Sequence, residues 1–405
     1  MSELLDAATR ERYADAVVAA GCAVRRGDLL VVRAQPAHRE FVIAVAAAAY
    51  ARGARHVETE IEDPLVAAAR FRSGAKNAIG ARSSWETKRA RTLTEPESAL
   101  LAIAGEGEPG AFDGIRPALL AADQGAVQKR LAWFRNAMLG GRVRWCIAGW
   151  PTEPWAKTVY PELEPFEAQQ RLARDLVRFC RVDSGRGIDG WVEHVKTLEA
   201  RARRLTQMKL QGLELRGPGT DLEIKLAPNT RWLGGRERAS GRLTSPNMPT
   251  EEVFTSPAPA GTRGIFRCSR PLNFRGRTID GIAGSFERGR LVTLTAAREE
   301  DRELLTAFVD TDRNARRLGE VALVDRTSRI GESGRTYENT LLDENAAAHI
   351  AFGDGFANTR GQGGPGVNRS GLHLDVMIGT DDFEVTGIAG RGRRVPLISN
   401  GLWQI

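Results

Sequence analysis

Five residues in the C-terminal half of the chain have side chains of the types that bind divalent metal ions. They are Glu251, Glu320, His349, His373 and Asp375. Carboxylates and imidazoles together are ligands that zinc, cobalt, manganese and iron accept in proteins. The whole chain has only 5 histidines, and two of them belong to this set. The set therefore predicts a metal site.

The most specific part of the set is a His-x-Asp pair, His373 and Asp375, in the segment Leu-His-Leu-Asp-Val. Alternate residues of a β-strand share a face, so in a strand both polar side chains point to the same side. The apolar residues that alternate with them, Leu372, Leu374 and Val376, then point into the core. We therefore expect a strand that carries two ligands on one face.

The charge of the set suits two metal ions. Glu251, Glu320 and Asp375 carry three negative charges, and a hydroxide balances the fourth positive charge of two divalent cations. Zinc lowers the pKa of its bound water to about 7, so a metal-bound hydroxide is available to attack a carbonyl at neutral pH. We expect Glu320 to bridge the two ions, and Glu252 or Glu344 to transfer protons as general base and acid.

The composition is that of a globular protein without a membrane or nucleic-acid partner. The 405 residues are 42% hydrophobic and 27% charged, and they are enough for two domains. No apolar run approaches the roughly 20 residues that span a bilayer. The net charge of +7 comes from arginines spread over nearly every segment, whereas a nucleic-acid site concentrates them in one stripe.

The N-terminal segment predicts a cytoplasmic location, and the cysteines are those expected of such a protein. The N-terminal segment Met-Ser-Glu-Leu-Leu-Asp has acids where a signal peptide has bases. The four cysteines form no Cys-x-x-Cys pair, so we interpret them as small buried side chains rather than as a zinc ribbon or a redox motif. They are Cys22, Cys146, Cys180 and Cys268.

The hydrophobic pattern predicts an α/β domain over residues 1–207 and an α+β domain rich in antiparallel strands over residues 208–405. In the first, strands at 29–33, 56–61, 99–104 and 143–149 alternate with helices, which indicates a parallel sheet. In the second, short alternating segments are separated by Gly- and Pro-rich turns, which indicates hairpins. A helix at 300–310 and a shorter one near 313–318 are expected there.

Several other features carry no predicted chemistry. His38, His56 and His194 lie in the first domain on patterns typical of surface or core-edge residues. The Gly-rich stretch 361–366 lacks the Gly-Lys-Ser/Thr ending of a phosphate loop, so we expect a flexible loop near the site. No Gly-x-Ser-x-Gly elbow supports a serine hydrolase.

Long segments of the chain resemble one family, the metallo-aminopeptidases typified by aminopeptidase T of thermophiles and aminopeptidase S. The resemblance is visible in Trp-Cys-Ile-Ala-Gly-Trp-Pro-Thr-Glu-Pro-Trp from Trp145, and in Asn-Met-Pro-Thr-Glu-Glu-Val-Phe-Thr from Asn247. It continues in Arg-Arg-Leu-Gly-Glu-Val-Ala-Leu-Val from Arg316, in Glu-Asn-Thr-Leu-Leu-Asp-Glu-Asn-Ala-Ala-Ala-His from Glu338, and in the ending Asn-Gly-Leu-Trp.

The resemblance implies two domains, a homodimer and a dinuclear site for zinc, cobalt, manganese or magnesium. Its motifs place metal ligands at the five residues named first, and they place Glu344 near the metals. The choice between Glu251 and Glu252 as first ligand stays open, with Glu251 favoured. One residue departs from the family: a tyrosine usually stands seven residues after the first histidine, where this chain has Phe356.

Three functions follow, in order of preference. The first is a metal-dependent aminopeptidase, or a closely related amidohydrolase, acting on a small peptide or amide. The second is a non-haem Fe(II) ring-cleaving dioxygenase, because His349, His373 and Asp375 form the two-His, one-carboxylate triad of such enzymes. The retention of Glu251 and Glu320 weighs against it. The third, a non-catalytic binding protein, predicts eroded ligands, yet every ligand position is occupied.

Overall fold

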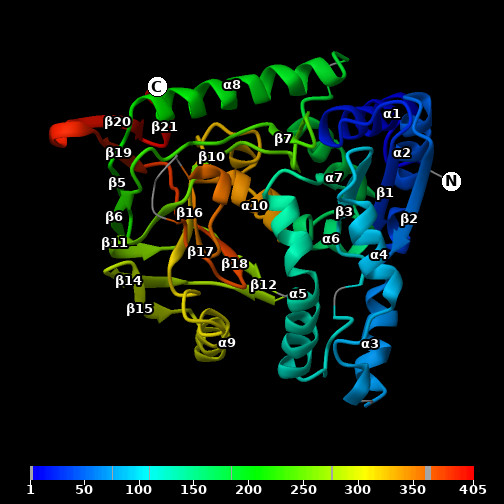
Figure 1. Cartoon of the computed structure of the whole chain (residues 1–405), viewed down its shortest axis with the longest axis horizontal. Helices are drawn as coiled ribbons and strands as arrows, with labels where there is room; N and C mark the ends of the chain where they lie inside the picture. Colours follow the sequence, from blue (N-terminus) through cyan, green and yellow to red (C-terminus); the bar gives the residue numbers. More distant parts are fainter. Residues whose placement is uncertain (1–2, 75, 109, 184, 275–276, 361–365) are drawn as a thin grey trace. The chain divides into compact units, whose positions relative to one another are not determined.

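A computed structural model describes residues 3–74, 76–108, 110–183, 185–274, 277–360 and 366–405 (Figure 1). The chain forms two compact units: Met1–Glu193 with Arg236–Pro249, and His194–Gly235 with Thr250–Ile405. A division into domains at residue 207 stays a prediction. The loop expected at 361–366 lies, except for Gly366, outside the described residues. In the part of the chain that is described, no helix is long and apolar enough to cross a membrane.

The first unit is built around the predicted parallel sheet. The strand order is β2-β1-β3-β4-β9, and each neighbouring pair is parallel. The apolar runs of β1 and β3 are almost wholly buried, as in sheets covered on both faces. The strands are β1 (Leu29–Ala34), β2 (His56–Ile61), β3 (Ser98–Ala104), β4 (Arg144–Gly149) and β9 (Asn247–Met248), with a separate hairpin of β7 (Glu237–Ala239) and β8 (Arg242–Thr244).

Helices follow the strands of this unit as the alternating pattern predicts. The long helices expected at 116–138, 165–182 and 188–207 are α5 (Pro117–Leu139), α7 (Pro165–Phe179) and α8 (Ile188–Gln207), the last of which continues into the second unit. The remaining helices are α1 (Ala7–Ala16), α2 (Arg39–Ala51), α3 (Pro64–Arg72), α4 (Ser84–Thr92) and α6 (Glu153–Val159).

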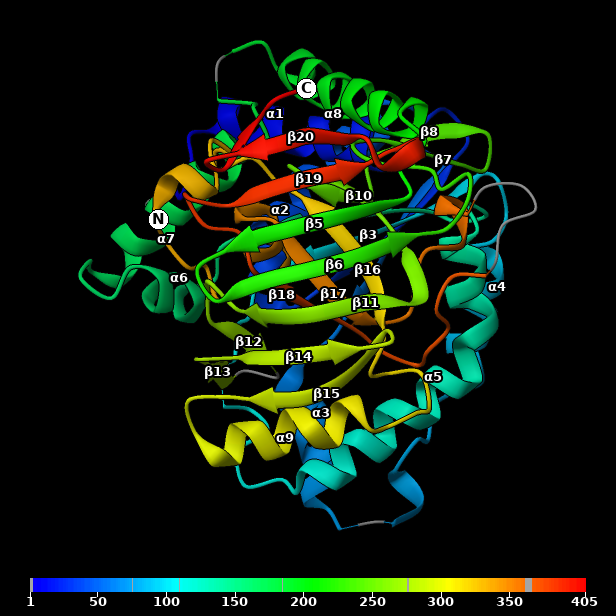
Figure 2. The same ribbon diagram turned by 90° about the vertical axis from the view of Figure 1, so that its left-hand side faces the viewer.

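The second unit contains a large antiparallel sheet, seen face-on in Figure 2. Its order is β15-β14-β11-β6-β5-β19-β20-β21. The strands are β5 (Gly212–Gly217), β6 (Thr220–Leu226), β11 (Pro257–Arg267), β14 (Ala283–Glu287), β15 (Arg290–Thr295), β19 (Glu384–Ile388), β20 (Arg394–Ser399) and β21 (Leu402–Trp403), and a small hairpin joins β12 (Leu272–Phe274) to β13 (Arg277–Ile279).

A second antiparallel sheet of four strands, in the order β10-β16-β17-β18, carries the predicted ligands. Its strands are β10 (Val253–Thr255), β16 (Leu318–Leu323), β17 (His349–Gly353) and β18 (His373–Met377). The helices of this unit are α9 (Glu299–Val309) and α10 (Thr340–Asp343), followed by the 3-10 turn η5 (Glu344–Ala346). The prediction of a short helix near 313–318 is wrong, because hydrogen-bonded turns lead directly into β16 there.

The two sheets of the second unit share one hydrophobic core. Phe266 and Phe286 of the large sheet each lie 5.8 Å, between ring centroids, from Phe352 of the small sheet. Val321, Ile350 and Val376 project into the same core from the small sheet. One face of the ligand-bearing sheet is therefore fixed by packing, so the alternate residues of its strands must project from the opposite face.

Candidate metal centre

Strand pairing brings the predicted ligands onto one face of the four-stranded sheet. Glu320 of β16 pairs with Ala351 of β17, which pairs in turn with Asp375 of β18. His373 lies two residues before Asp375 on the same strand, as the sequence predicts, and His349 opens β17. Ala351 is fully buried between the two carboxylate-bearing residues. Its methyl group takes up little space, so the carboxylates can approach each other across it.

A bulge in β16 sets the position of Glu320. The pairing register between β16 and β17 shifts between Leu318 and Glu320. A Cβ at Gly319, the residue between them, would lie only 2.1 Å from the carbonyl oxygen of Asp354. Only glycine permits this approach of two backbones. The same carbonyl oxygen accepts the Nδ1–H of His373 at 2.9 Å. The bulge therefore places the atom that orients His373 close to the backbone that carries Glu320.

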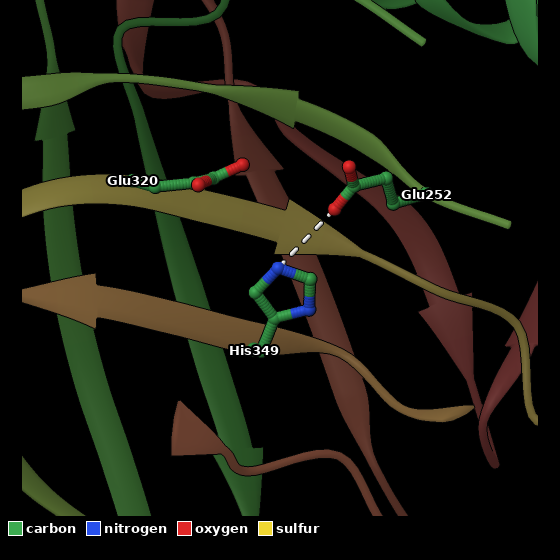
Figure 3. Close-up of side chains that lie close together, drawn as sticks. All are labelled: Glu252, Glu320 and His349. Atoms are coloured by element: carbon green, nitrogen blue, oxygen red, sulfur yellow. Dashed lines mark ion pairs between the residues drawn. The ribbon is translucent and has the colours of Figure 1, made fainter. Parts of the chain in front are cut away.

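The side chains form two groups that are able to hold metal ions. In the first, Glu252 Oε2 lies 3.2 Å from His349 Nε2, and Glu320 lies within the same group (Figure 3). In the second, His373 Nε2 lies 3.1 Å from Glu320 Oε2 and 3.2 Å from Asp375 Oδ1. Glu320 belongs to both groups. A carboxylate shared in this way has the position of a bridge between two ions.

Both imidazoles are oriented by hydrogen bonds from their other ring nitrogen. His373 Nδ1 donates to Asp354 O, and His349 Nδ1 donates to Ala347 O at 3.3 Å. With the Nδ1 atom protonated, the Nε2 atom of each ring faces the carboxylates. Metal-binding histidines in proteins are usually held in this way, because the second hydrogen bond fixes the tautomer.

The packing of so many acids perturbs their protonation. Burial raises the pKa of Glu320 to about 7, against the lowering effect of the hydrogen bond from His373. Burial alone disfavours a charged His349, but the contact with Glu252 outweighs it and raises the pKa of His349 to about 10. Burial followed by the charges of Asp375 and Glu252 raises the pKa of Glu344 well above its usual range. Divalent cations bound among these buried carboxylates would stabilise their charged forms.

Glu251 and Glu252 have different neighbours, although they are adjacent in the sequence. Glu252 lies with His349 and Glu320. Glu251 is also buried, but its Oε2 lies 3.6 Å from His194 Nε2. Successive residues of an extended segment point to opposite sides, so the two carboxylates separate. The structure brings together Glu252, Glu320, His349, His373 and Asp375, with Glu344 close by, and it does not bring Glu251 into either group.

Two residues near the site were given no functional role from the sequence: His194 was interpreted as a surface or core-edge residue, and Asn345 was not considered. His194, at the beginning of the second unit, places its Nε2 2.8 Å from the carbonyl oxygen of Thr250. Asn345 is fully buried and accepts the backbone N–H of Glu251 at 2.7 Å. Neither has a local pattern that marks it, because each acts on a segment more than fifty residues away in the sequence.

Phe356, where the family usually has tyrosine, lies beside the second group. Its ring centroid is 5.4 Å from that of His373 and 4.9 Å from that of Phe254. The backbone N–H of Phe356 donates to Ser256 Oγ at 2.8 Å, which fixes the start of this loop. The position therefore faces the predicted metal ligands, but its ring offers them no hydroxyl.

Comparison with known proteins decides the family. The family of thermophilic metalloproteases (M29) matches residues 7–403. The chain belongs to this family. Aminopeptidase AmpS of Bacillus subtilis is 33% identical over 402 residues, which cover 96% of this chain and 97% of that protein. Aminopeptidase T of Thermus aquaticus is 34% identical over 403 residues, with 97% and 98% covered.

The structures agree with this assignment. Wild-type AmpT of Thermus thermophilus superposes with a TM-score of 0.90 at 32% identity, covering 98% of this chain and 99% of that chain. The prediction of a metal-dependent aminopeptidase is confirmed, as is the fold class of a parallel α/β domain followed by a domain rich in antiparallel strands. Because the family is one of metalloproteases, the enzyme works with divalent metal ions.

The alternative of a ring-cleaving dioxygenase is not supported. The 2,5-dihydroxypyridine dioxygenase of Pseudomonas putida KT2440 superposes with a TM-score of 0.54 at 12% identity, which shows a shared fold alone. The family and the named relatives favour the aminopeptidase. The donor set fits that activity as well, because one carboxylate is common to two groups, and a lone Fe(II) triad has no need of a second group.

Proposed function

We propose that this metallo-aminopeptidase binds two divalent ions on the ligand-bearing face of its four-stranded sheet and removes N-terminal residues from small peptides or related amides. Glu252, Glu320 and His349 hold one ion, and Glu320, His373 and Asp375 hold the other. The observation that supports this most directly is the membership of Glu320 in both groups. When bound, the ions supply Lewis acidity toward a water molecule and toward the scissile carbonyl.

In this proposal Glu252, rather than the expected Glu251, is the first ligand. Glu252 Oε2 lies 3.2 Å from His349 Nε2, and the shared group includes Glu320. Glu251 lies beside His194 instead and contributes its buried charge from outside the two groups. Glu252→Ala should therefore remove one metal equivalent, whereas Glu251→Ala should leave both. The reverse result would restore the original assignment.

The proposed role of Glu344 is proton transfer. It takes a proton from the attacking water and passes it to the amine of the leaving group. Its raised pKa, caused by burial and by the charges of Asp375 and Glu252, supports a group that holds a proton for part of the cycle. Glu252, the other candidate from the sequence, is committed to the metal in this scheme.

Metal content with and without Glu320 tests the proposed site. The purified enzyme is dialysed against buffer with free Zn²⁺, Co²⁺ or Mn²⁺, and bound metal is measured by elemental analysis. Two equivalents in the native enzyme, and loss of at least one in Glu320→Ala, support the bridge. Two equivalents in both proteins, or one in both, contradict it. Hydrolysis of aminoacyl p-nitroanilides by the same samples links metal content to activity.

The metal identity, the oligomeric state and the cellular location can each be measured directly. The metal identity within zinc, cobalt, manganese and magnesium follows from the elemental analysis, because these donors accept most first-row ions. A homodimer is tested by sedimentation, and a cytoplasmic location by cell fractionation. The free thiols of Cys22, Cys146, Cys180 and Cys268 are compatible with a reducing compartment.

A further inference from the structure

Asn345 is a buried side-chain amide that connects two segments of the catalytic unit. It is fully buried in η5, and its Oδ1 accepts the backbone N–H of Glu251 at 2.7 Å. Its Nδ2 donates to Leu341 O at 2.9 Å and to Glu344 Oε1 at 3.4 Å. These contacts use the acceptor and both donors of the amide. One side chain therefore links the backbone next to Glu252 with the carboxylate of Glu344.

We propose that Asn345 is a positioning residue with two separate tasks. Its acceptor oxygen holds the backbone at Glu251 and thereby sets Glu252 against His349, and its donor nitrogen holds Glu344 in place for proton transfer. This inference rests on the roles given above to Glu252 and Glu344. Asn345 itself is not titratable and belongs to neither metal group.

The backbone around Glu252 shows why such a support is needed. Pairing of β10 with β16 begins at Val253, one residue after Glu252. The residues before it are held by two side chains: His194 reaches Thr250 O at 2.8 Å, and Asn345 receives Glu251 N–H. Removing the latter contact leaves a buried N–H without this acceptor and frees the end of the strand to move. A metal ligand tolerates only small displacements from its productive geometry.

The donor half of Asn345 has a different consequence. Glu344 follows directly after α10 and opens the short 3-10 turn η5. The Nδ2 atom of Asn345 ties this turn to Leu341 O and contacts the Glu344 carboxylate at the same time. Loss of the donor should displace Glu344 without moving Glu252. The two tasks are thus separable by substitution.

Asn345→Ala tests the task of the acceptor. Supports of metal ligands typically contribute about 10–100-fold to metal affinity. Dialysis against buffers of graded free Zn²⁺ should show the affinity of one of two bound equivalents lowered by about that factor, with the other unchanged. Thr255→Val is the matched control. It removes another side-chain hydrogen bond, from the buried Thr255 of β10 to Arg231 O. Equal weakening in both variants, or none in Asn345→Ala, overturns the proposal.

A double variant separates positioning from general stability. If Asn345 acts through Glu252, then Asn345→Ala adds no further loss of Zn²⁺ affinity once Glu252→Ala is present. A purely structural role predicts that the two losses add, and additive losses therefore contradict the proposal. Native enzyme that binds no Zn²⁺ at all would instead overturn the proposed function, so the two failures are distinguishable.

Asn345→Asp tests the task of the donor and remains informative if Asn345→Ala does not fold. The aspartate keeps an oxygen for Glu251 N–H but replaces the donor with a second acceptor beside Glu344. Two Zn²⁺ equivalents should be retained while kcat for a leucyl p-nitroanilide falls about 10–100-fold at an unchanged KM. A native kcat, or loss of metal as in the alanine variant, overturns the separation of tasks. Folding of each variant is checked by circular dichroism.

Discussion

Glu344 is the residue whose assignment most needs a direct test. It lies near Asp375, Glu252 and His349: burial, followed by the charges of Asp375 and Glu252, raises the pKa of Glu344 against the lowering effect of His349. If Glu344 transfers protons rather than holding metal, Glu344→Gln should keep both metal equivalents and lower kcat by about 10²–10⁴-fold. Elemental analysis and steady-state kinetics on one preparation check both parts. Loss of metal together with activity would show that Glu344 is a ligand instead.

Phe356 offers a gain-of-function test at the same scale. Its ring lies edge-on to His373 at 5.4 Å, so a tyrosine there would place a hydroxyl toward the second metal group. One hydrogen-bond donor at the reacting carbonyl is typically worth about 10²–10³-fold in rate. We expect Phe356→Tyr to raise kcat by at least about tenfold on aminoacyl p-nitroanilides. Phe356→Leu, which changes the packing without adding a donor, should not raise it.

At the scale of elements, the four-stranded sheet determines where the ligands go. Its inner face packs Val321 and Ile350 into the core, and its outer face carries Glu320 and Asp375 across Ala351. The bulge at Gly319 is the least replaceable part of this arrangement, because any Cβ there meets Asp354 O at 2.1 Å.

We therefore expect Gly319→Ala to lower the free energy of unfolding by about 1–3 kcal/mol and to weaken metal binding, since the displaced carbonyl oxygen also orients His373. Urea unfolding and Zn²⁺ titration measure the two effects. Gly371→Ala is the control, because its nearest neighbour, Asp312 Oδ2, would lie 3.6 Å from the new Cβ. Equal effects of the two substitutions would remove the bulge from this explanation.

At the scale of the whole molecule, the first unit has a pH-sensitive core independent of the metal ligands. His38 is fully buried, with Nδ1 accepting Gln35 N–H at 3.2 Å and Nε2 donating to Gly105 O at 3.1 Å. Burial, against the effect of the bond to Gly105, lowers the pKa of His38 to about 4 from its ordinary 6.5. The folded chain thus keeps this imidazole neutral where the unfolded chain protonates it.

The sign of the resulting pH dependence follows from proton binding. Between about pH 6.5 and pH 4 the unfolded state binds one proton more, so the free energy of unfolding falls as the pH falls through this window. The full loss is at most about 3 kcal/mol. His38→Gln should remove this part of the slope, as measured by urea unfolding at pH 4.5 and 7.5 with saturating Zn²⁺. An identical pH slope in both proteins would argue against a buried neutral His38.

Much of the fold was predictable because it depends on local patterns. The period-two alternation around His373 and Asp375 predicts their shared face without knowledge of neighbouring strands, and the two side chains do lie in one group with Glu320. Apolar runs between helices likewise predicted the parallel sheet. The short helix near 313–318 failed because its helical spacing was overridden by the turns that connect α9 to β16.

What the sequence by itself determined was the family, the fold class and the kinds of side chain in the site. Only the tertiary structure decided which of two adjacent acids, Glu251 or Glu252, lies with His349 and Glu320. That choice depends on the pairing of β10 with β16, since a shift by one residue in an extended chain exchanges the two faces. The support from Asn345 could not be predicted from the sequence either, because its contact with Glu251 spans 94 positions and leaves no local periodicity.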